Sequence, residues 1–254
     1  MHALAGVGLM ATMYEAASAN FREVEKALTA LERTINRSIR DNDDAAVAAL
    51  TRAQLLLVSI KAEARLIKIA YMPDGLPDHE RSKVLGADTA VDRWLDAIEF
   101  AFRRHYRVSR RRHDPEDFLE HDELARYRTL RELVSKDLGS VISLRNKLAH
   151  GQWVYPFNSE LTAVEAGTVR LLSAENTFTL KIRDNLIQII GNAVIDLVKS
   201  AAGFEALFNA HFRRIRENRR HLATVSYDDW CARVRSTKRL LRPSEGSDGV
   251  EGKG

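Results

Sequence analysis

Hydrophobic residues recur along most of this chain at three- and four-residue steps, the spacing that places them on one face of an α-helix. The pattern predicts a first helix over 15–40 and, after the N-cap side chains of 41–44, a second over about 44–71. Residues 72–78 contain two prolines and a glycine, so we expect a loop there. Similar stripes predict a third helix over 89–112, a fourth over about 119–149 and a return to helix over 184–220.

The pattern changes after Gly151. The stretches "WVYPFN", "LTAVEAGTVRLLS" and "TFTLKI" are rich in β-branched and aromatic residues, which favours a small β-hairpin within 152–182. The low-complexity end, 242–254, is expected to be a disordered tail. The sequence therefore predicts a mainly α fold: one domain over 1–241, a helical bundle of four or more helices with a small β-hairpin insert after the fourth helix.

The composition is that of a folded soluble protein, with 45% hydrophobic and 29% charged residues in a chain of 254. A single cysteine, Cys231, excludes a disulfide within the chain and a CxxC metal site, and it fits a reducing cytosol. The apolar start has no cationic region before it and is too short to span a bilayer, and we expect no membrane segment elsewhere. The prediction is a cytoplasmic protein.

Positive charge is concentrated in two runs, "RRHYRVSRRRH" (103–113) and "HFRRIRENRRH" (211–221). A clustered basic face is typical of a phosphate-binding surface, and the alternative is a solvated helix face. We interpret the second run as solvated surface. In the first run the candidates for guiding an RNA backbone are Arg103, Arg104, Arg107, Arg110, Arg111 and Arg112.

The segment "RNKLAHG" (145–151) ends the predicted fourth helix, and Gly151 stands where a left-handed C-cap residue belongs. An arginine followed five positions later by a histidine is a weak pattern, since Arg216 and His221 match it equally well. The context separates the two matches. In the first, Asn146 follows the arginine, and a pair of leucines four residues apart is expected to anchor the segment to the core.

These residue types suit the cleavage of RNA. A histidine titrates near neutral pH, so His150 can take a proton from a ribose 2′-hydroxyl or give one to the leaving 5′-oxygen. Arg145 offers a permanent positive charge for the phosphate oxygens, and Asn146 can orient either group. The chemistry requires no metal and no cofactor. The alternative is that His150 is an ordinary helix-end histidine and Arg145 a surface cation.

Helix geometry adds a constraint on this set. At about 100° per residue Asn146 and His150 share a face, whereas Arg145 is offset from His150 by roughly 140°. The two cations therefore reach one phosphate if the arginine side chain wraps around the helix, or if a second copy of the helix faces the first. The spacing favours a homodimer.

Arg145, Asn146 and His150 resemble, position for position, the signature of the HEPN superfamily, in which an arginine is followed by a polar residue and, after four to six residues, a histidine. The resemblance implies a HEPN-like bundle, a dimer with both motifs in one cleft, and metal-independent endoribonuclease activity leaving 2′,3′-cyclic phosphate and 5′-hydroxyl ends. It also implies a toxin–antitoxin or antiviral context with an antitoxin or regulatory partner. Members neutralised by nucleotidylation carry a tyrosine where this chain has Gln152, so we do not assign it to that group.

Three further residues lie near the motif or are expected to reach it. Glu63, among apolar residues of the second helix, resembles the acidic residue that faces the motif helix in some HEPN members, and the alternative is a helix ion pair with a neighbouring lysine or arginine. Lys147 and Trp153 are candidates for RNA contact, the tryptophan by stacking on a base, although a core or interface position is the alternative for the latter. The histidines at 105, 113 and 121 lack metal-ligand spacing, so no metal site is predicted.

Two other functional interpretations stay open. The first is a non-catalytic HEPN dimer, a scaffold that binds RNA, nucleotide or a protein partner through the same cleft. The second is an ordinary helical interaction domain in which the motif is accidental.

Overall fold

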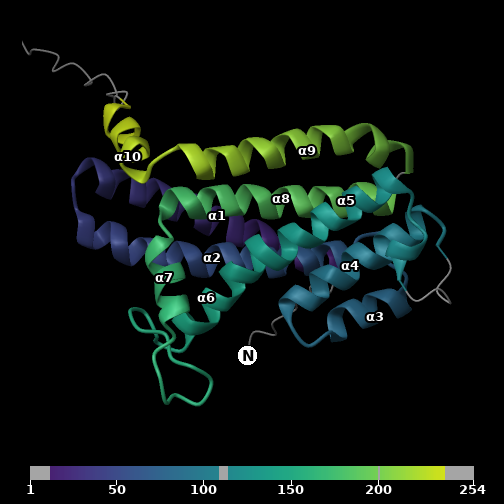
Figure 1. Cartoon of the computed structure of the whole chain (residues 1–254), viewed down its shortest axis with the longest axis horizontal. Helices are drawn as coiled ribbons and strands as arrows, with labels where there is room; N and C mark the ends of the chain where they lie inside the picture. Colours follow the sequence, from purple (N-terminus) through teal and green to yellow (C-terminus); the bar gives the residue numbers. More distant parts are fainter. Residues whose placement is uncertain (1–11, 109–113, 200, 238–254) are drawn as a thin grey trace, which may run out of the picture.

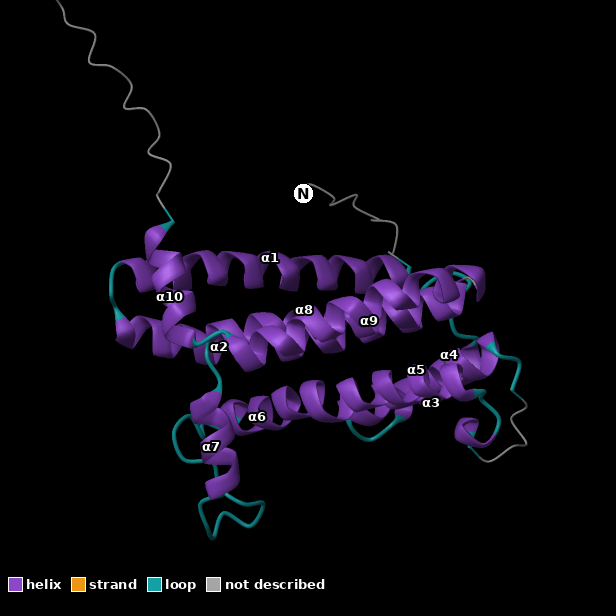
Figure 2. Ribbon diagram, turned by 45° about the horizontal axis from the view of Figure 1, so that its top comes forward, coloured by secondary structure: helices purple, strands orange, loops and turns teal. Residues whose placement is uncertain are grey.

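The computed structural model describes residues 12–108, 114–199 and 201–237, and this part of the chain is mainly helical with no β-strand (Figures 1 and 2). The mainly α prediction is confirmed. In chain order the elements are α1 (Met13–Arg40), α2 (Asp44–Ala70), α3 (Asp78–Gly86), α4 (Ala90–His105), the 3₁₀ turn η1 (Pro115–Asp117), α5 (His121–Glu132), the π-helical segment η2 (Leu133–Leu138), α6 (Gly139–Ala149), α7 (Ala166–Ala174), α8 (Thr177–Lys199), α9 (Ala201–Thr224) and α10 (Tyr227–Ser236).

Local capping explains where the first two helices begin. Thr12 and Glu15 form a reciprocal capping box at the start of α1, which satisfies backbone N–H groups that the first turn leaves open. The chain reverses at Asn42, whose φ is 54°, and the Asp43 carboxylate then accepts a hydrogen bond of 2.9 Å from the Ala46 N–H. The predicted first and second helices are confirmed.

The central element is α2, which packs against α1, α6 and α8. Leu55, Val58, Ala62, Leu66 and Ile69 of this helix are buried. By length and composition alone it is also long and apolar enough to span a membrane, so the expectation that no stretch after the N-terminus approaches that length is wrong. Its burial among other helices is typical of the core helix of a soluble protein.

The fourth predicted helix is found as one helical path through α5, η2 and α6. The π segment in its middle adds a residue to the turn, which rotates the following helix relative to the first. Leu133, Leu138 and Leu144 are buried along this path. Figure 1 shows that the path runs obliquely across α8 and α2 and brings the end of α6 close to α7.

The predicted β-hairpin within 152–182 is wrong. Residues 166–174 form α7 and α8 begins at Thr177, and the loop between α6 and α7 contains one isolated bridge, between Phe157 and Val164. Leu172 and Leu180 are buried against leucines of α2 and α6. Burial of this kind outweighs the modest preference of β-branched and aromatic residues for strands, which is itself a matter of packing.

Several boundaries also differ from the prediction. The helix α4 ends at His105 rather than continuing to 112, and residues 109–113 lie outside the described part of the chain. The stretch 184–220 belongs to two helices, α8 and α9, and α3 occupies a region without a prediction. The predicted tail, 242–254, lies outside the described residues.

Gly191 of α8 provides the space in which Arg65 of α2 lies. A Cβ at Gly191 would come within 2.6 Å of Arg65 Cδ, and Arg65 is held by a hydrogen bond of 2.7 Å to Asn192. We therefore expect Gly191→Ala to lower the free energy of unfolding by about 1–3 kcal/mol, the usual cost of overpacking, as measured by urea denaturation. Gly167→Ala is the matched control, because a Cβ there meets nothing within 4 Å. Equal or greater stability of the Gly191 variant would contradict this packing.

Candidate active site at the end of α6

The C-terminus of α6 closes in a Schellman motif. Gly151 has a φ of +76°, its N–H donates to the Leu148 carbonyl at 3.0 Å, and the Gln152 N–H donates to the Lys147 carbonyl at 3.0 Å. The predicted C-cap role of Gly151 is confirmed. Because these bonds end the helix at a defined residue, they fix the backbone of His150, which is exposed at the last turn.

Two leucines set the rotation of α6 about its axis. Leu144 and Leu148 are almost fully buried and pack with Leu55 of α2, Leu172 of α7 and Leu180 of α8. The predicted anchoring is confirmed. With this side of α6 turned inward, Arg145 faces α2, while Asn146 lies on the exposed side.

Arg145 forms an ion pair with Glu63 of α2, through Nη2 and Oε1, and its Nε donates to the Ser59 hydroxyl at 3.3 Å. The side chains of Arg145 and Glu63 are 26% and 34% exposed, so the pair lies at the surface between the two helices. The alternative partners of Glu63 are engaged elsewhere: Lys61 pairs with Asp184 at 2.9 Å, and Arg65 contacts Asn192. The expectation that Glu63 faces the motif helix agrees with this geometry.

Ser59 is a site residue that sequence reasoning missed. It is buried, and it stands four residues before Glu63, so both side chains lie on the same face of α2. That spacing was the available signal, and it became meaningful once α6 was seen to pack there. Together Ser59 and Glu63 take two of the N–H directions of the Arg145 guanidinium, which presents five in all.

The remaining polar groups of the motif point away from the protein. Asn146 and His150 are both exposed, and within the described part of the chain neither side chain forms a hydrogen bond. Nη1 of Arg145 likewise has no described hydrogen-bond partner. Arg145 and His150 therefore point in different directions, as the helix geometry predicted. The guanidinium of Arg145 is held against α2, and the imidazole of His150 is exposed to solvent, where it can contact a ligand.

The loop after the motif is fastened to α6 by Lys147. Its Nζ donates to the Phe157 carbonyl and lies 3.2 Å from the Glu165 carboxylate, while Gln152 Oε1 accepts a hydrogen bond of 2.8 Å from the Phe157 N–H. Hydrogen bonds from Thr168 and Lys147 lower the pKa of the Glu165 carboxyl. Lys147 is thus engaged in holding the loop.

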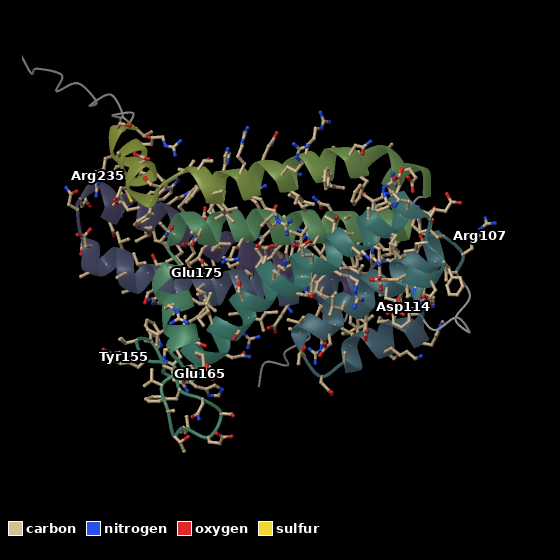
Figure 3. All side chains as sticks on the ribbon, viewed as in Figure 1. Arg107, Asp114, Tyr155, Glu165, Glu175 and Arg235 are labelled. Atoms are coloured by element: carbon tan, nitrogen blue, oxygen red, sulfur yellow. The ribbon has the colours of Figure 1, made fainter. Side chains whose placement is uncertain are left out.

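Aromatic and apolar side chains of this loop are exposed beside the motif. The indole N–H of Trp153 donates to the Leu148 carbonyl at 3.0 Å, which fixes the ring, yet 42% of the residue is exposed. Tyr155, labelled with Glu165 in Figure 3, is 61% exposed. The fixed ring of Trp153 and the exposed ring of Tyr155 offer faces on which unpaired bases can stack.

The described part of the first basic run, 103–108, lies away from the motif. Figure 3 shows Arg107 at the opposite end of the molecule from Tyr155 and Glu165. Arg103 is buried and pairs with Glu99 at 2.7 Å. Arg104 donates to the Gly75 carbonyl, Arg107 is exposed, and Arg110, Arg111 and Arg112 lie outside the described residues. Within one chain the structure does not bring the described members of this run to the motif.

The second Arg–His match, Arg216 and His221, lies on the exposed side of α9, and neither residue forms an ion pair with any described residue. Among the residues that the structure describes, no group of three or more His, Cys, Asp or Glu side chains is placed to hold a metal ion.

Comparison with known proteins adds no relative: the chain matches no protein-family model, no curated protein and no solved structure. The functional argument therefore depends on the geometry of this site and on the sequence motif.

The Arg145–Glu63 pair should be measurable as a coupling free energy. In a double-mutant cycle of Arg145→Gln and Glu63→Gln, we expect an interaction of about 1 kcal/mol in the free energy of unfolding, because a charge-assisted pair is partly shielded between two helices. Urea denaturation of the four proteins measures it. The same cycle with Glu63 and Lys68, which are not ion-paired, should be additive. Additivity of Arg145 and Glu63 would show that the pair contributes nothing to stability.

Proposed function

We propose that this protein is a metal-independent endoribonuclease of the HEPN type, active as a homodimer. Arg145 stabilises charge on the reacting phosphate, His150 transfers protons, Asn146 orients the two, and Glu63 positions the arginine. The products are a 2′,3′-cyclic phosphate and a 5′-hydroxyl end.

The observation that carries the proposal is the contact of Arg145 with Glu63 and Ser59. An arginine that is simply solvated at a helix end would not contact a buried serine and a carboxylate on another helix. Here the two groups hold the guanidinium by two of its nitrogens and leave Nη1 without a described partner. Preorganisation of this kind favours stabilisation of a developing negative charge, since the cation does not have to reorganise during the reaction.

The proposed reaction requires two proton transfers, one from the ribose 2′-hydroxyl and one to the departing 5′-oxygen. The ribose 2′-oxygen attacks the adjacent phosphorus and loses its proton to one imidazole, and the bond from phosphorus to the 5′-oxygen then breaks. The departing 5′-oxygen takes a proton from a second, protonated imidazole. We assign these roles to His150 and to His150 of the partner subunit, because a single α6 presents one histidine.

A face suited to such a dimer surrounds the site. Ile60 and Ile67 of α2 are 43% and 40% exposed and stand seven residues apart, on either side of Glu63 along the helix. The neighbouring exposed positions of α6 include Ser143 and Asn146, whose small side chains allow another helix to approach closely. A twofold axis through this face would bring both motifs into one cleft.

The resemblance to HEPN proteins supports a wider proposal as well. The setting that we propose from it is a toxin–antitoxin or antiviral system with a protein partner that restrains cleavage, and the single cysteine favours the cytoplasm as the location. The exposed apolar residues of the loop between α6 and α7 supply a surface for such a partner or for RNA bases.

The same ion pair also favours a second candidate, a HEPN dimer that binds RNA, nucleotide or protein without cutting. In that case Glu63 neutralises Arg145 permanently, and the pair joins α2 to α6 as a structural element. The two candidates differ in one measurable property, the cleavage of RNA by the wild-type protein.

Cleavage is tested by incubating the purified protein with mixed RNA in EDTA. We expect cutting that leaves 2′,3′-cyclic phosphate ends, and a decrease of at least about 100-fold in its rate for His150→Ala, since the imidazole supplies general acid–base catalysis. Dimer state and melting temperature of the variant are checked beside it.

His221→Ala is the matched control, because that histidine belongs to the second match on α9 and should leave the rate unchanged. Equal cleavage by the wild type and His150→Ala would remove the assigned role of His150. Absence of cleavage by a well-folded wild-type dimer that still binds RNA would favour the scaffold.

The dimer face gives a separate prediction. The double substitution Ile60→Glu and Ile67→Glu places four carboxylates in a symmetric interface, so we expect monomers in sedimentation velocity and a rate of RNA cleavage at least tenfold lower. Leu207→Glu changes a residue of similar exposure on α9 and should alter neither. Dimers that persist in the double variant would show that the subunits meet through another face.

A further inference from the structure

The cations of α1 are sorted to one side of the helix. In sequence this region mixes both signs, but the carboxylates of Glu25 and Glu32 line a cavity of about 250 Å³ between α1, α2 and α8, beside Lys61. Burial in this cavity raises the pKa of the Glu32 carboxyl. The outer side of α1 is left with a row of exposed cations: Arg22, Lys26, Arg33 and Arg37.

Three of the four cations in this row have no carboxylate partner among the described residues. Lys26 pairs with Glu23 at 2.7 Å, but within the described part of the chain the three arginines of the row form no ion pair. The row from Arg22 to Arg37 extends about 22 Å along the helix, at about 1.5 Å per residue. Three of its members, Arg22, Lys26 and Arg33, line one shallow hollow together with Glu25 and Thr29, which also line the cavity.

A second set of cations lies on α9. Arg213, Arg214 and Arg220 are exposed, and none of them forms an ion pair with a described residue. By contrast, Arg219 on another side of the helix pairs with Glu132 and Asp137. The unpaired arginines therefore face outward.

The helix α8 links α1, which carries the first set, to α9, which carries the second. Asn185 of α8 lines the same cavity as Glu25 of α1, and its amide donates to Asn218 of α9 at 3.5 Å. Lys181, exposed on α8, lines the cavity as well. Figures 1 and 2 show α1, α8 and α9 running along the long axis of the molecule. We define the basic face as Arg22, Lys26, Arg33, Arg37, Lys181, Arg213, Arg214 and Arg220.

The basic face has no apolar component. Large hydrophobic residues that are exposed among the described residues lie on the α6–α7 loop, on the outer side of α2 and at Met13, Phe118, Leu171, Leu207 and Phe212, and none belongs to the middle of α1 or to 213–237. A helix that rests on a membrane needs an apolar side, and a platform for single-stranded RNA needs aromatic rings. A surface that offers positive charge but no apolar or aromatic groups fits a partner that exposes its phosphates and keeps its bases stacked inside a double helix.

We infer that the basic face binds the phosphate backbone of double-helical RNA. The choice of RNA rests on the proposed function, which it deepens: the substrate is a structured RNA whose stem lies on α1, α8 and α9. Double-helical RNA is recognised through its shape and its backbone, which matches a face without stacking groups.

The test is equilibrium binding of the full chain to a labelled RNA duplex of about 16 base pairs, the length that a double-stranded-RNA-binding module typically spans. Fluorescence anisotropy is followed between about 50 and 200 mM salt. The variant Arg33→Gln/Lys181→Gln/Arg214→Gln removes one cation from each of the three helices. We expect at least tenfold weaker binding and a salt slope that is smaller by about two to three, close to one for each phosphate that the variant no longer neutralises.

The matched control is Lys83→Gln/Arg128→Gln/Lys136→Gln, which removes the same charge from exposed positions of α3, α5 and η2. It should bind as the wild type does. An equal loss in both triple variants, or no loss in the first, would overturn the assignment of the face. Stronger binding to oligouridine, or equal charge-dependent binding to vesicles of phosphatidylcholine and phosphatidylserine, would overturn the assignment of the partner.

Because this readout involves no cleavage, it separates the inference from the proposed function. We expect His150→Ala to bind the duplex as tightly as the wild type, whether or not the wild type cuts RNA. Tight duplex binding without cleavage by any form would support the basic face and contradict the nuclease.

Discussion

The packing of α6 against α2 decides where every polar group of the candidate site lies. Leu144 and Leu148 bury one side of α6, and the hydrophobic gain from their burial fixes its rotation. Arg145 is thereby brought over Glu63 and Ser59, while Asn146 is turned to solvent. The ion pair is a consequence of this apolar contact, because an exposed pair by itself contributes too little to orient a helix.

The loop after α6 depends on the same contact. Once the Schellman motif ends the helix at His150, Lys147 and Gln152 are in place to hold the loop through Phe157 and Glu165. The loop is held by side-chain bonds to the helix end, by hydrogen bonds of the Asn158 side chain to Thr162 and Ala163, and by a few backbone bonds around one isolated bridge. This arrangement leaves aromatic rings exposed beside the motif. In the predicted β-hairpin, the strands would instead have paired their backbones and pointed successive side chains to opposite faces.

The clusters of basic residues in the sequence do not predict where positive charge gathers on the surface. In the first basic run Arg103 is buried against Glu99. The mixed-sign sequence of α1, by contrast, produces a row of exposed cations, because the helix turns Glu25 and Glu32 toward the cavity beside α8. A helix points consecutive residues in different directions and brings residues three or four apart onto the same side. A cluster of basic residues in the sequence therefore does not by itself form a basic patch on the surface.

The sequence by itself determined the first two helices, the helical path that ends at Ala149, and the motif. Apolar periodicity predicted α1, α2 and the path to Ala149, and the local chemistry of glycine at a helix end predicted the role of Gly151, since each depends on residues within a few turns. Tertiary structure alone decided the helical state of residues 166–174 and 177–182, the contact of Ser59 with Arg145 and the exposed rows of cations on α1 and α9. These features depend on which distant segments pack together, and short-range propensity gives way where burial of Leu172 and Leu180 stabilises a helix instead of a strand.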